Sequence, residues 1–311
     1  MNAEELLRPP SSMKGFQTAM DLTTGFEKIV RRDEPLAMHT WFQLGGSAEY
    51  FAEPANPDEL IVLIKRCHEE EIPVRLLGRG SNVLVRDEGV PGVVVRLSSP
   101  EFSKIGIDGQ AVTAGGGAAL GRTITTAVHQ GLAGLEALIG IPGTVGGALF
   151  GNAGSHAGDI GQWVGRVTVI SQTGEVYGRE HDELEFAYRQ SNLDELVILD
   201  AAFQLEEDDP AELARRMQKY WIVKKANQPM GHQCAGCVFK NPRGASAGEM
   251  IEEAGLKGTR IGGAVVSDRH ANFIVAEPEC TSQDVLRLID LVRGQVHDRL
   301  GIELERELEI W

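Results

Sequence analysis

The chain has 311 residues, enough for about two domains, and 42% of them are hydrophobic while 24% are charged, a balance that excludes wholesale disorder. The formal net charge of −15 argues against a general surface for nucleic acid or for anionic membranes. The sequence predicts neither a membrane helix nor a secretory signal, so we expect a cytoplasmic protein. Glycine is the outlier, with 37 residues, and the excess should lie in turns and close-approach loops.

The first hundred residues predict a strand–helix–strand unit. Asn56 is a good helix N-cap and Pro57 suits the first helical position, so a helix should begin there. The segment 39–54 before it combines aromatic and β-branched side chains with a Gly-Gly break, which predicts strand, turn, strand. Two further strands are expected after the helix, over 72–78 and 93–97.

The middle of the chain predicts several strands and one helix. A strand over 111–115 should run into three glycines, and a helix is expected from about 119–130. The glycine-rich stretch 139–158 predicts a loop. A hairpin over 166–178 and a long strand over 195–205 should follow.

The composition shifts at 206–210, which we interpret as a domain boundary. Helices are expected to begin after Asp209, after Ser246 and after Thr281, because each is a good N-cap. The segments AVVS and ANFIVA between the last two helices predict strands. The tail 302–310 alternates apolar residues with glutamate, as a strand with one buried face does.

Two glycine-rich segments are candidate ligand sites. LGRGSNVLV (77–85) can present backbone N–H groups to a phosphate, although it matches neither the GK[ST] loop nor the G-x-G-x-x-G fingerprint, and a plain β-turn is equally compatible. In 139–148 repeated glycine lets the backbone approach a flat or charged ligand, and Thr144, Asn152 and Ser155 add neutral hydrogen-bonding groups. A loop of this length is uncommon unless it is functional.

Four further residues carry reactive side chains. Arg189, in YRQS, has the planar fork that suits a carboxylate, although a surface arginine is the commoner case. Cys234 and Cys237 form one CxxC, and no second ligand pair follows, so we expect no metal site. The FKNP after them favours strand and turn over a redox helix, which leaves Cys234 incidental. Glu307 is one of four glutamates on a face that is usually solvated.

In combination these segments resemble the UDP-N-acetylenolpyruvoylglucosamine reductase family, flavoenzymes of peptidoglycan precursor synthesis. The resemblance runs from about His39 to Trp311 through LGRGSNVLV, GIPGTVGGALFGNAG, YRQS, GCVFKNP, HANFIV and LEREL, in the family's order. No extra segment separates YRQS from the helix after Asp209, as in the shorter form of the family, which lacks a mobile tyrosine-bearing loop.

The resemblance implies an α+β fold: a two-subdomain FAD-binding region of the vanillyl-alcohol-oxidase (PCMH) type and a C-terminal α+β substrate domain. We place a polar leader at 1–24, the FAD-binding region at 25–206, and the substrate domain at 207–311. The two subdomains of the FAD-binding region would cover about 25–98 and 99–206.

The implied reaction is the NADPH-dependent, FAD-mediated reduction of UDP-N-acetylglucosamine enolpyruvate to UDP-N-acetylmuramate. Arg189 would hold the substrate carboxylate and stabilise the enolate, and Glu307 would assist it. The implied substrate contacts are Tyr188, Lys225, Lys240 and Asn241. The implied FAD contacts are Leu77, Gly78, Arg79, Gly80, Ser81, Asn82, Val83, Gly140, Ile141, Pro142, Gly143, Thr144, Gly146, Gly147, Ala148, Asn152, Gly154, Gly158 and Ile160.

The main departure from the family is Cys237, because the family's GSxFKNP segment has a serine there that gives a proton to the substrate. An unperturbed thiol has a pKa of about 8.5 and is a far stronger acid than an alcohol, so we expect Cys237 to be the proton donor. Cys234, three residues away, would be able to resolve or trap an oxidised Cys237.

The acidic chain needs a locally cationic site for such a substrate, and the candidate cations are Arg189, Lys224, Lys225, Lys240 and Arg243. Two alternatives stay open. One is an oxidase on the same flavin scaffold, with His129 or His156 as a covalent tether to FAD. The other is a non-catalytic nucleotide-binding or redox-sensing module that uses the CxxC. We expect a monomer or a weak dimer.

Overall fold

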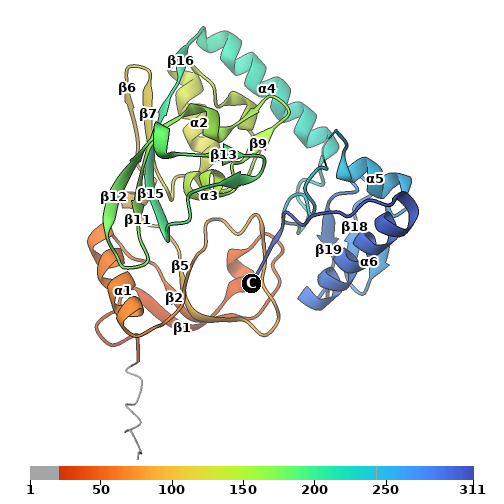
Figure 1. Cartoon of the computed structure of the whole chain (residues 1–311), viewed down its shortest axis with the longest axis horizontal. Helices are drawn as coiled ribbons and strands as arrows, with labels where there is room; N and C mark the ends of the chain where they lie inside the picture. The colour runs from red at the N-terminus through yellow and green to blue at the C-terminus, as the bar shows by residue number, and fades with distance from the viewer. Residues whose placement is uncertain (1–20, 243) are drawn as a thin grey trace, which may run out of the picture.

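The computed structural model describes residues 21–242 and 244–311 (Figure 1). Most of the predicted leader, residues 1–20, and the candidate cation Arg243 lie outside the described residues. Leu22, near the start of the described chain, is fully buried. None of the helices within the described ranges has both the length and the apolar character that a membrane crossing requires.

The N-terminal part is a four-stranded sheet, and α1 (Pro57–Glu69) shares a buried cluster with it. As predicted, Asn56 caps this helix, because its side-chain oxygen accepts a hydrogen bond from the backbone N–H of Glu59 at 3.0 Å. Strand β1 pairs antiparallel with β2, and the other pairs are parallel. In sheet order the strands are β1 (Val30–Pro35), β2 (Ser47–Ala52), β5 (Val90–Val95) and β3 (Val74–Leu76).

The predicted first strand of 39–54 is wrong. That stretch begins with the end of a 3₁₀ turn (Leu36–His39) and a loop, and the strand lies earlier, at β1. The sequence VRRDEP conceals it because its side chains are mostly exposed or half-buried at the edge of the sheet, so it carries no apolar alternation.

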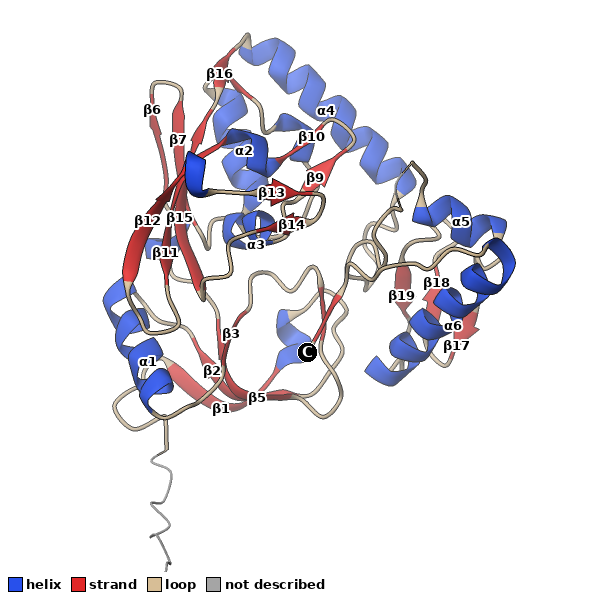
Figure 2. Ribbon diagram, in the orientation of Figure 1, coloured by secondary structure: helices blue, strands red, loops and turns tan. Residues whose placement is uncertain are grey.

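The second part is a five-stranded antiparallel sheet, and α2 (Leu120–His129) shares the core beside it (Figure 2). The predicted hairpin, the strand over 111–115 and the long later strand are confirmed. In sheet order the strands are β12 (Val176–Glu180), β11 (Val164–Ile170), β15 (Val197–Gln204), β7 (Ala111–Gly115) and β6 (Ile105–Asp108).

The prediction of a loop over 139–158 is wrong in its centre, where α3 (Val145–Phe150) forms. Thr144 caps it, with its hydroxyl oxygen accepting from the Gly147 N–H at 3.2 Å. The helix buries Val145 and Leu149 in the core. Two glycines among six residues conceal this helix from propensity arguments.

The third part follows the long helix α4 (Pro210–Asn227), which runs along one side of the molecule in Figure 1. This third part consists of a three-stranded antiparallel sheet and two helices. The predicted capping box is confirmed at Thr281, and Ser246 accepts from the Glu249 N–H. These elements are α5 (Ala247–Glu253), α6 (Ser282–Leu300), β17 (Arg260–Ile261), β18 (Ala264–Val266) and β19 (Ile274–Ala276).

The tail returns to the N-terminal part, where β20 (Glu309–Ile310) pairs parallel with β4 (Val83–Leu84). The apolar residues Leu304 and Leu308 are buried, as the alternation of the tail predicted. Only Glu309–Ile310 of this segment forms a regular strand. The other short pairs are β8 (Leu132–Ala133) with β16 (Glu206–Glu207), β9 (Gly154–Ser155) with β10 (Gly158–Asp159), and β13 (Phe186–Ala187) with β14 (Gln190–Ser191). The 3₁₀ turns besides Leu36–His39 are Pro100–Ser103, Glu136–Leu138, Ile160–Trp163 and His181–Glu183.

The glycine run after β7 gives a stability prediction. A methyl group on Gly116 would lie 1.9 Å from the carbonyl oxygen of Ile198, so we expect Gly116→Ala to lower the free energy of unfolding by about 2 kcal/mol or more. In the matched control Gly121→Ala, within α2, a methyl group meets nothing within 4 Å and should stabilise the helix by up to ~1 kcal/mol. Urea titration followed by circular dichroism measures both, and equal midpoints would contradict this packing.

Candidate functional site

Arg189 lies at the tip of a hairpin. Strands β13 and β14 pair antiparallel, and Tyr188 with Arg189 forms the turn between them. Arg189 has a φ of 57°, in the left-handed region that a non-glycine residue seldom adopts. Such a conformation persists only where surrounding contacts determine it, and it is commonest at functional sites.

Asn152 is one of those contacts. Its side-chain N–H donates to the carbonyl oxygen of Ala187 at 2.8 Å, and its side-chain oxygen accepts from the Gly161 N–H at 3.1 Å. The residue is 1% exposed. The prediction that Asn152 contacts FAD is therefore corrected for its side chain, which instead braces the arginine hairpin.

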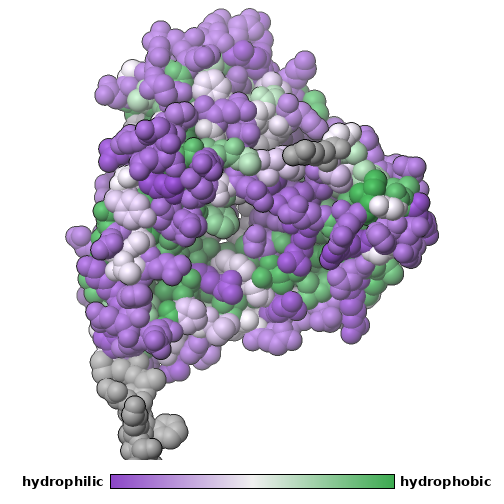
Figure 3. Space-filling model, in the orientation of Figure 1, coloured by the Kyte–Doolittle hydropathy of each residue, from purple (hydrophilic) through white to green (hydrophobic). Residues whose placement is uncertain are grey.

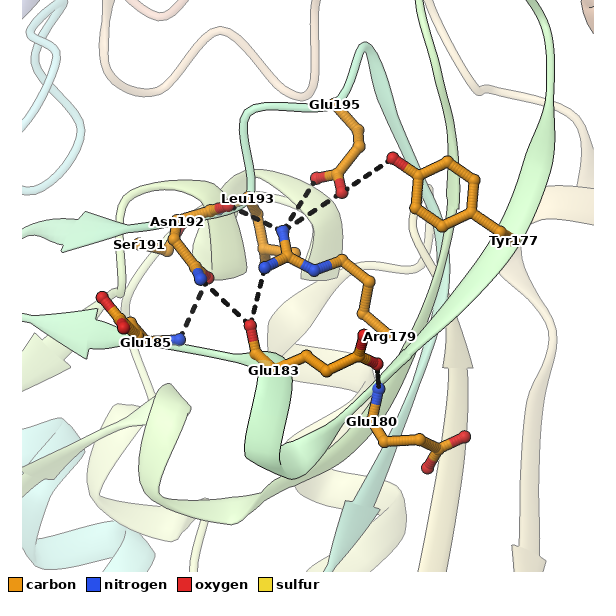
Figure 4. A network of polar contacts seen from close by, with 9 residues as sticks. All are labelled: Tyr177, Arg179, Glu180, Glu183, Glu185, Ser191, Asn192, Leu193 and Glu195. Atoms are coloured by element: carbon orange, nitrogen blue, oxygen red, sulfur yellow. Dashed lines mark hydrogen bonds and ion pairs between the residues drawn. The ribbon is translucent and has the colours of Figure 1, made fainter.

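Arg179 fastens the ends of the same segment (Figure 4). Its guanidinium donates to the carbonyl oxygens of Asn192 at 2.7 Å and Glu183 at 2.6 Å, and it forms an ion pair with Glu195 at 3.1 Å. The side chain of Asn192 closes the ring by donating to the Glu183 carbonyl at 3.0 Å. Sequence reasoning missed this network, since an arginine on an outer strand usually indicates only a solvated face.

Arg189 meets Glu307 from the returning tail. The guanidinium Nε donates to Oε1 of Glu307 at 2.7 Å, and Nη2 donates to the carbonyl oxygen of Gly154 at 3.3 Å. The Asn82 side chain donates to the Glu307 carbonyl at 3.1 Å, which ties the tail to LGRGSN. Burial raises the pKa of Glu307, and Arg189 opposes that rise.

Cys237 completes the cluster. Burial and, less strongly, the charge of Glu307 raise the pKa of its thiol to about 12 against the opposing charge of Arg189, so the thiol stays protonated at neutral pH. The residue lies in an irregular segment that leads to an isolated bridge between Phe239 and Arg306. The segment is not helical, as expected, but the expected strand is reduced to that one bridge.

Asn272 holds the backbone just after Cys237. Its side-chain oxygen accepts from the Phe239 N–H at 2.9 Å, and its side-chain N–H donates to the Phe239 carbonyl at 2.8 Å. Asn272 is buried, so this pairing is protected from water. The HANFIV motif contains Asn272, but sequence reasoning gave it no role.

The two glycine-rich segments lie against each other. The Ser81 hydroxyl donates to the carbonyl oxygen of Pro142 at 2.9 Å, and a methyl on Gly78 would lie 2.9 Å from the hydroxyl of Thr144. Gly80 has a φ of 62°, and a methyl there would lie 2.4 Å from the carbonyl oxygen of His39. These close approaches explain why the first segment needs glycine at both positions.

A cleft of about 160 Å³ opens beside the first of these segments. Thr40 is one of the residues that line this cleft, and its buried hydroxyl has no hydrogen-bond partner in the described chain. Its lining is cationic and partly aromatic, and it consists of Met38, His39, Thr40, Trp41, Arg79 and Arg96. Of these, sequence reasoning had named only Arg79.

Two predicted cofactor contacts turn out to be core residues. Ala148 on α3 and Ile160 just after β10 are buried with the five-stranded sheet, so their side chains pack in the protein. Gly154 lies beside Arg189: a methyl on it would lie 3.3 Å from Nη1. Gly158 has a φ of 133°, which serves the turn between β9 and β10.

The predicted substrate contacts gather around the hairpin, except Lys225. The Asn241 N–H donates to the hydroxyl oxygen of Tyr188 at 3.1 Å, and Lys240 forms an ion pair with Glu305 at 2.6 Å. Lys225 is exposed on α4. Its neighbour Lys224 is instead half-buried and donates to a backbone carbonyl of the second glycine segment.

The face shown in Figure 3 has a hydrophilic rim, and hydrophobic residues gather toward its middle. Several large apolar side chains remain exposed although they belong to elements of the site. They are Phe150, which ends α3, Tyr188 beside the catalytic candidate, and Trp221 on α4. Exposed aromatic groups next to polar ones are typical of a ligand site.

Comparison with known proteins identifies two matched segments. Residues 48–178 match the family described as FAD binding domain. Residues 228–311 match the C-terminal domain of UDP-N-acetylenolpyruvoylglucosamine reductase. These matches show an FAD-binding region followed by the C-terminal domain of the reductase family, and the mixture of helices and strands confirms the expected α+β fold class.

Relatives cover nearly the whole chain. UDP-N-acetylenolpyruvoylglucosamine reductase 2 of Symbiobacterium thermophilum is 45% identical over 91% of this chain and 92% of its own length. The reductase of Heliobacterium modesticaldum is 43% identical over 93% of each chain. The crystal structure of the reductase from Thermus caldophilus matches with a TM-score of 0.79 and 38% identity, and the match covers 91% of this chain and 99% of that one. The chain therefore belongs to the UDP-N-acetylenolpyruvoylglucosamine reductase family.

Proposed function

We propose that Arg189, Glu307 and Cys237 form the catalytic centre of this reductase, which converts UDP-N-acetylglucosamine enolpyruvate to UDP-N-acetylmuramate. The observation that supports this is their convergence: the Arg189–Glu307 pair joins residues 118 positions apart, and both side chains act on the pKa of Cys237. The family's enzymes use FAD and NADPH. The oxidase and CxxC-module alternatives are not favoured, because relatives matching nine-tenths of the chain are named as reductases.

The residues of the chain fit FAD. Arg79 and Arg96 line the cleft, and their guanidinium groups would bind the diphosphate of FAD. The buried hydroxyl of Thr40, which also lines the cleft, has no hydrogen-bond partner in the described chain. When bound, FAD would supply the hydride chemistry of the reaction, with NADPH as the source of the hydride and the substrate double bond as its acceptor. We propose that the backbones of 77–83 and 140–147, with Gly154 and Gly158, lie along the cofactor.

Arg189 would stabilise the charge that develops during the reaction. Hydride addition to the vinyl carbon leaves negative charge on the neighbouring carbon and on its carboxylate. A guanidinium already fixed by Glu307 needs little reorganisation to face that charge, an effect often worth several kcal/mol. We propose this role for Arg189, with Glu307 as the group that orients it.

Cys237 would then deliver the proton. The raised pKa keeps the thiol protonated until a strongly basic carbon forms beside it. The thiolate left after transfer faces the Arg189 guanidinium, whose charge favours that form. We further propose Tyr188, Lys240 and Asn241 as substrate contacts, since they lie around the same hairpin.

We also propose the domain limits 25–206 and 207–311 for the FAD-binding region and the substrate domain. Separate buried clusters around α2, around α1 and around α6 support the division. The cluster around α6 also includes Phe42 and Leu84, so the substrate domain packs directly on the N-terminal part. A cytoplasmic location and a monomer or weak dimer stay predictions.

Replacing Cys237 tests the proton donor. In Cys237→Ala, NADPH should bleach the flavin at near the parental rate, while reoxidation by the enolpyruvyl substrate should slow by about 10²–10⁴-fold, the usual contribution of a general acid. Cys237→Ser should retain activity. Anaerobic stopped-flow absorbance separates the two half-reactions. Cys234→Ala serves as control, and parental reoxidation in Cys237→Ala would exclude this donor.

Replacing Thr40 tests the cofactor site. Thr40→Val keeps the side-chain shape but removes the unpartnered hydroxyl, so the dissociation constant of FAD should rise about fivefold to tenfold, as for loss of one hydrogen bond. Titration of flavin-free protein by fluorescence measures it. The exposed Thr113→Val, on β7, should leave FAD binding unchanged. Equal affinity for Thr40→Val and the parent would remove this cleft from the cofactor site.

A further inference from the structure

Lys224 lies where α4 meets the second glycine segment. Its ammonium donates to the carbonyl oxygen of Ile139 at 2.7 Å. A methyl on Gly140 would lie 3.2 Å from Cδ of Lys224 and 3.0 Å from the ring of Trp221. Both side chains therefore run across the surface of this segment, and glycine leaves the space for them.

The charge on Lys224 has no anionic partner in the structure. Within 21–242 and 244–311, no carboxylate oxygen forms a salt bridge with its ammonium. Arg189 is the charged neighbour that affects it, and that neighbour is another cation. Burial and, less strongly, the charge of Arg189 together lower the pKa of Lys224 to about 8. Glu307 offsets the charge of Arg189, so the half-buried charge of Lys224 is the one that an anion bound beside it would compensate.

We propose that Lys224 is a substrate ligand that binds, together with Arg189, the carboxylate of the enolpyruvyl group. This inference rests on the proposed function. The carboxylate is attached to the double bond, so it must lie close both to the flavin surface and to Arg189. Lys224 is the lysine that contacts the glycine segment and whose ammonium lies near enough to Arg189 for the two charges to repel.

This assignment differs from the motif-based choice of Lys225. Adjacent residues on a helix point about 100° apart, so only one of the two lysines can face the site. Lys224 is half-buried there and Lys225 is exposed. Lys225 is therefore the competing candidate, and substitution of each lysine in turn distinguishes it from Lys224.

The test measures binding to the FAD-loaded enzyme through the change in flavin absorbance. Lys224→Met should weaken the enolpyruvyl substrate about tenfold to hundredfold, as for loss of a charge-assisted hydrogen bond, and Lys224→Arg should restore most of it. UDP-N-acetylglucosamine, which lacks the carboxylate, should bind both proteins within about twofold of the parent. Lys219→Met, at an exposed position of α4, is the matched control.

The pH dependence provides a second readout. Lys224 is charged below its pKa, so parental affinity should fall as the pH rises through about 8, and Lys224→Arg should move that fall to higher pH. The facing segment 139–144 carries no titratable side chain, and the charged neighbour that acts on Lys224 is Arg189.

Three results would overturn the inference: parental affinity in Lys224→Met, the same loss in Lys225→Met alone, or an equal loss for UDP-N-acetylglucosamine, which would indicate a diphosphate ligand. Failure of the proposed function is distinct, because the parental protein would then not be reoxidised by the enolpyruvyl substrate. Flavin content and melting temperature show that each variant is folded.

Discussion

The ion pair between Arg189 and Glu307 is the contact on which the site depends. It joins a hairpin of the FAD-binding region to the tail of the substrate domain, at 2.7 Å. The hairpin holds an arginine in a left-handed conformation, and the tail is held by main-chain pairing on both sides. Neither element would place its charge accurately alone. A pair that is half-buried and hydrogen-bonded gains more from accurate placement than an exposed one does.

The electrostatics of this region are local. The chain as a whole carries a large negative charge, yet Arg189, Lys224 and Lys240 gather around the cluster. Burial destabilises the charged form of each group there. It therefore raises the pKa of Glu307 and Cys237 and lowers that of Lys224. All three shifts favour the neutral form of the group. Such a site favours an anionic ligand, because its carboxylates do not fully neutralise its cationic side chains.

The sequence predicted the elements that have strong local signals. Asn56 and Thr281 mark helix starts through chemistry that depends on a few neighbouring residues, and both are confirmed. It failed where structure depends on distant partners: β1 has an exposed, charged sequence and forms only because β2 lies beside it. At the site, motif resemblance selected Arg189, Glu307 and Cys237; in the structure the first two form an ion pair, and both charges act on the thiol of the third.

Their supports could not be read locally. Asn152 and Asn272 act through bonds to backbone groups more than thirty residues away. Similarly, the lone hydroxyl of Thr40 becomes informative only once burial is known.

The hydrogen bond from Asn82 to the backbone of Glu307 spans 225 positions along the chain. Contacts of such separation close late in folding, because the entropy of ordering the intervening segment must first be offset by local structure. The flavin region can thus acquire its shape before the carboxylate of Glu307 arrives. A protein cleaved or locally unfolded in its last third would keep the cofactor pocket but lose the contact of Glu307 with Arg189. The absorbance of bound flavin would then overestimate the fraction of molecules in which the proposed catalytic residues are assembled.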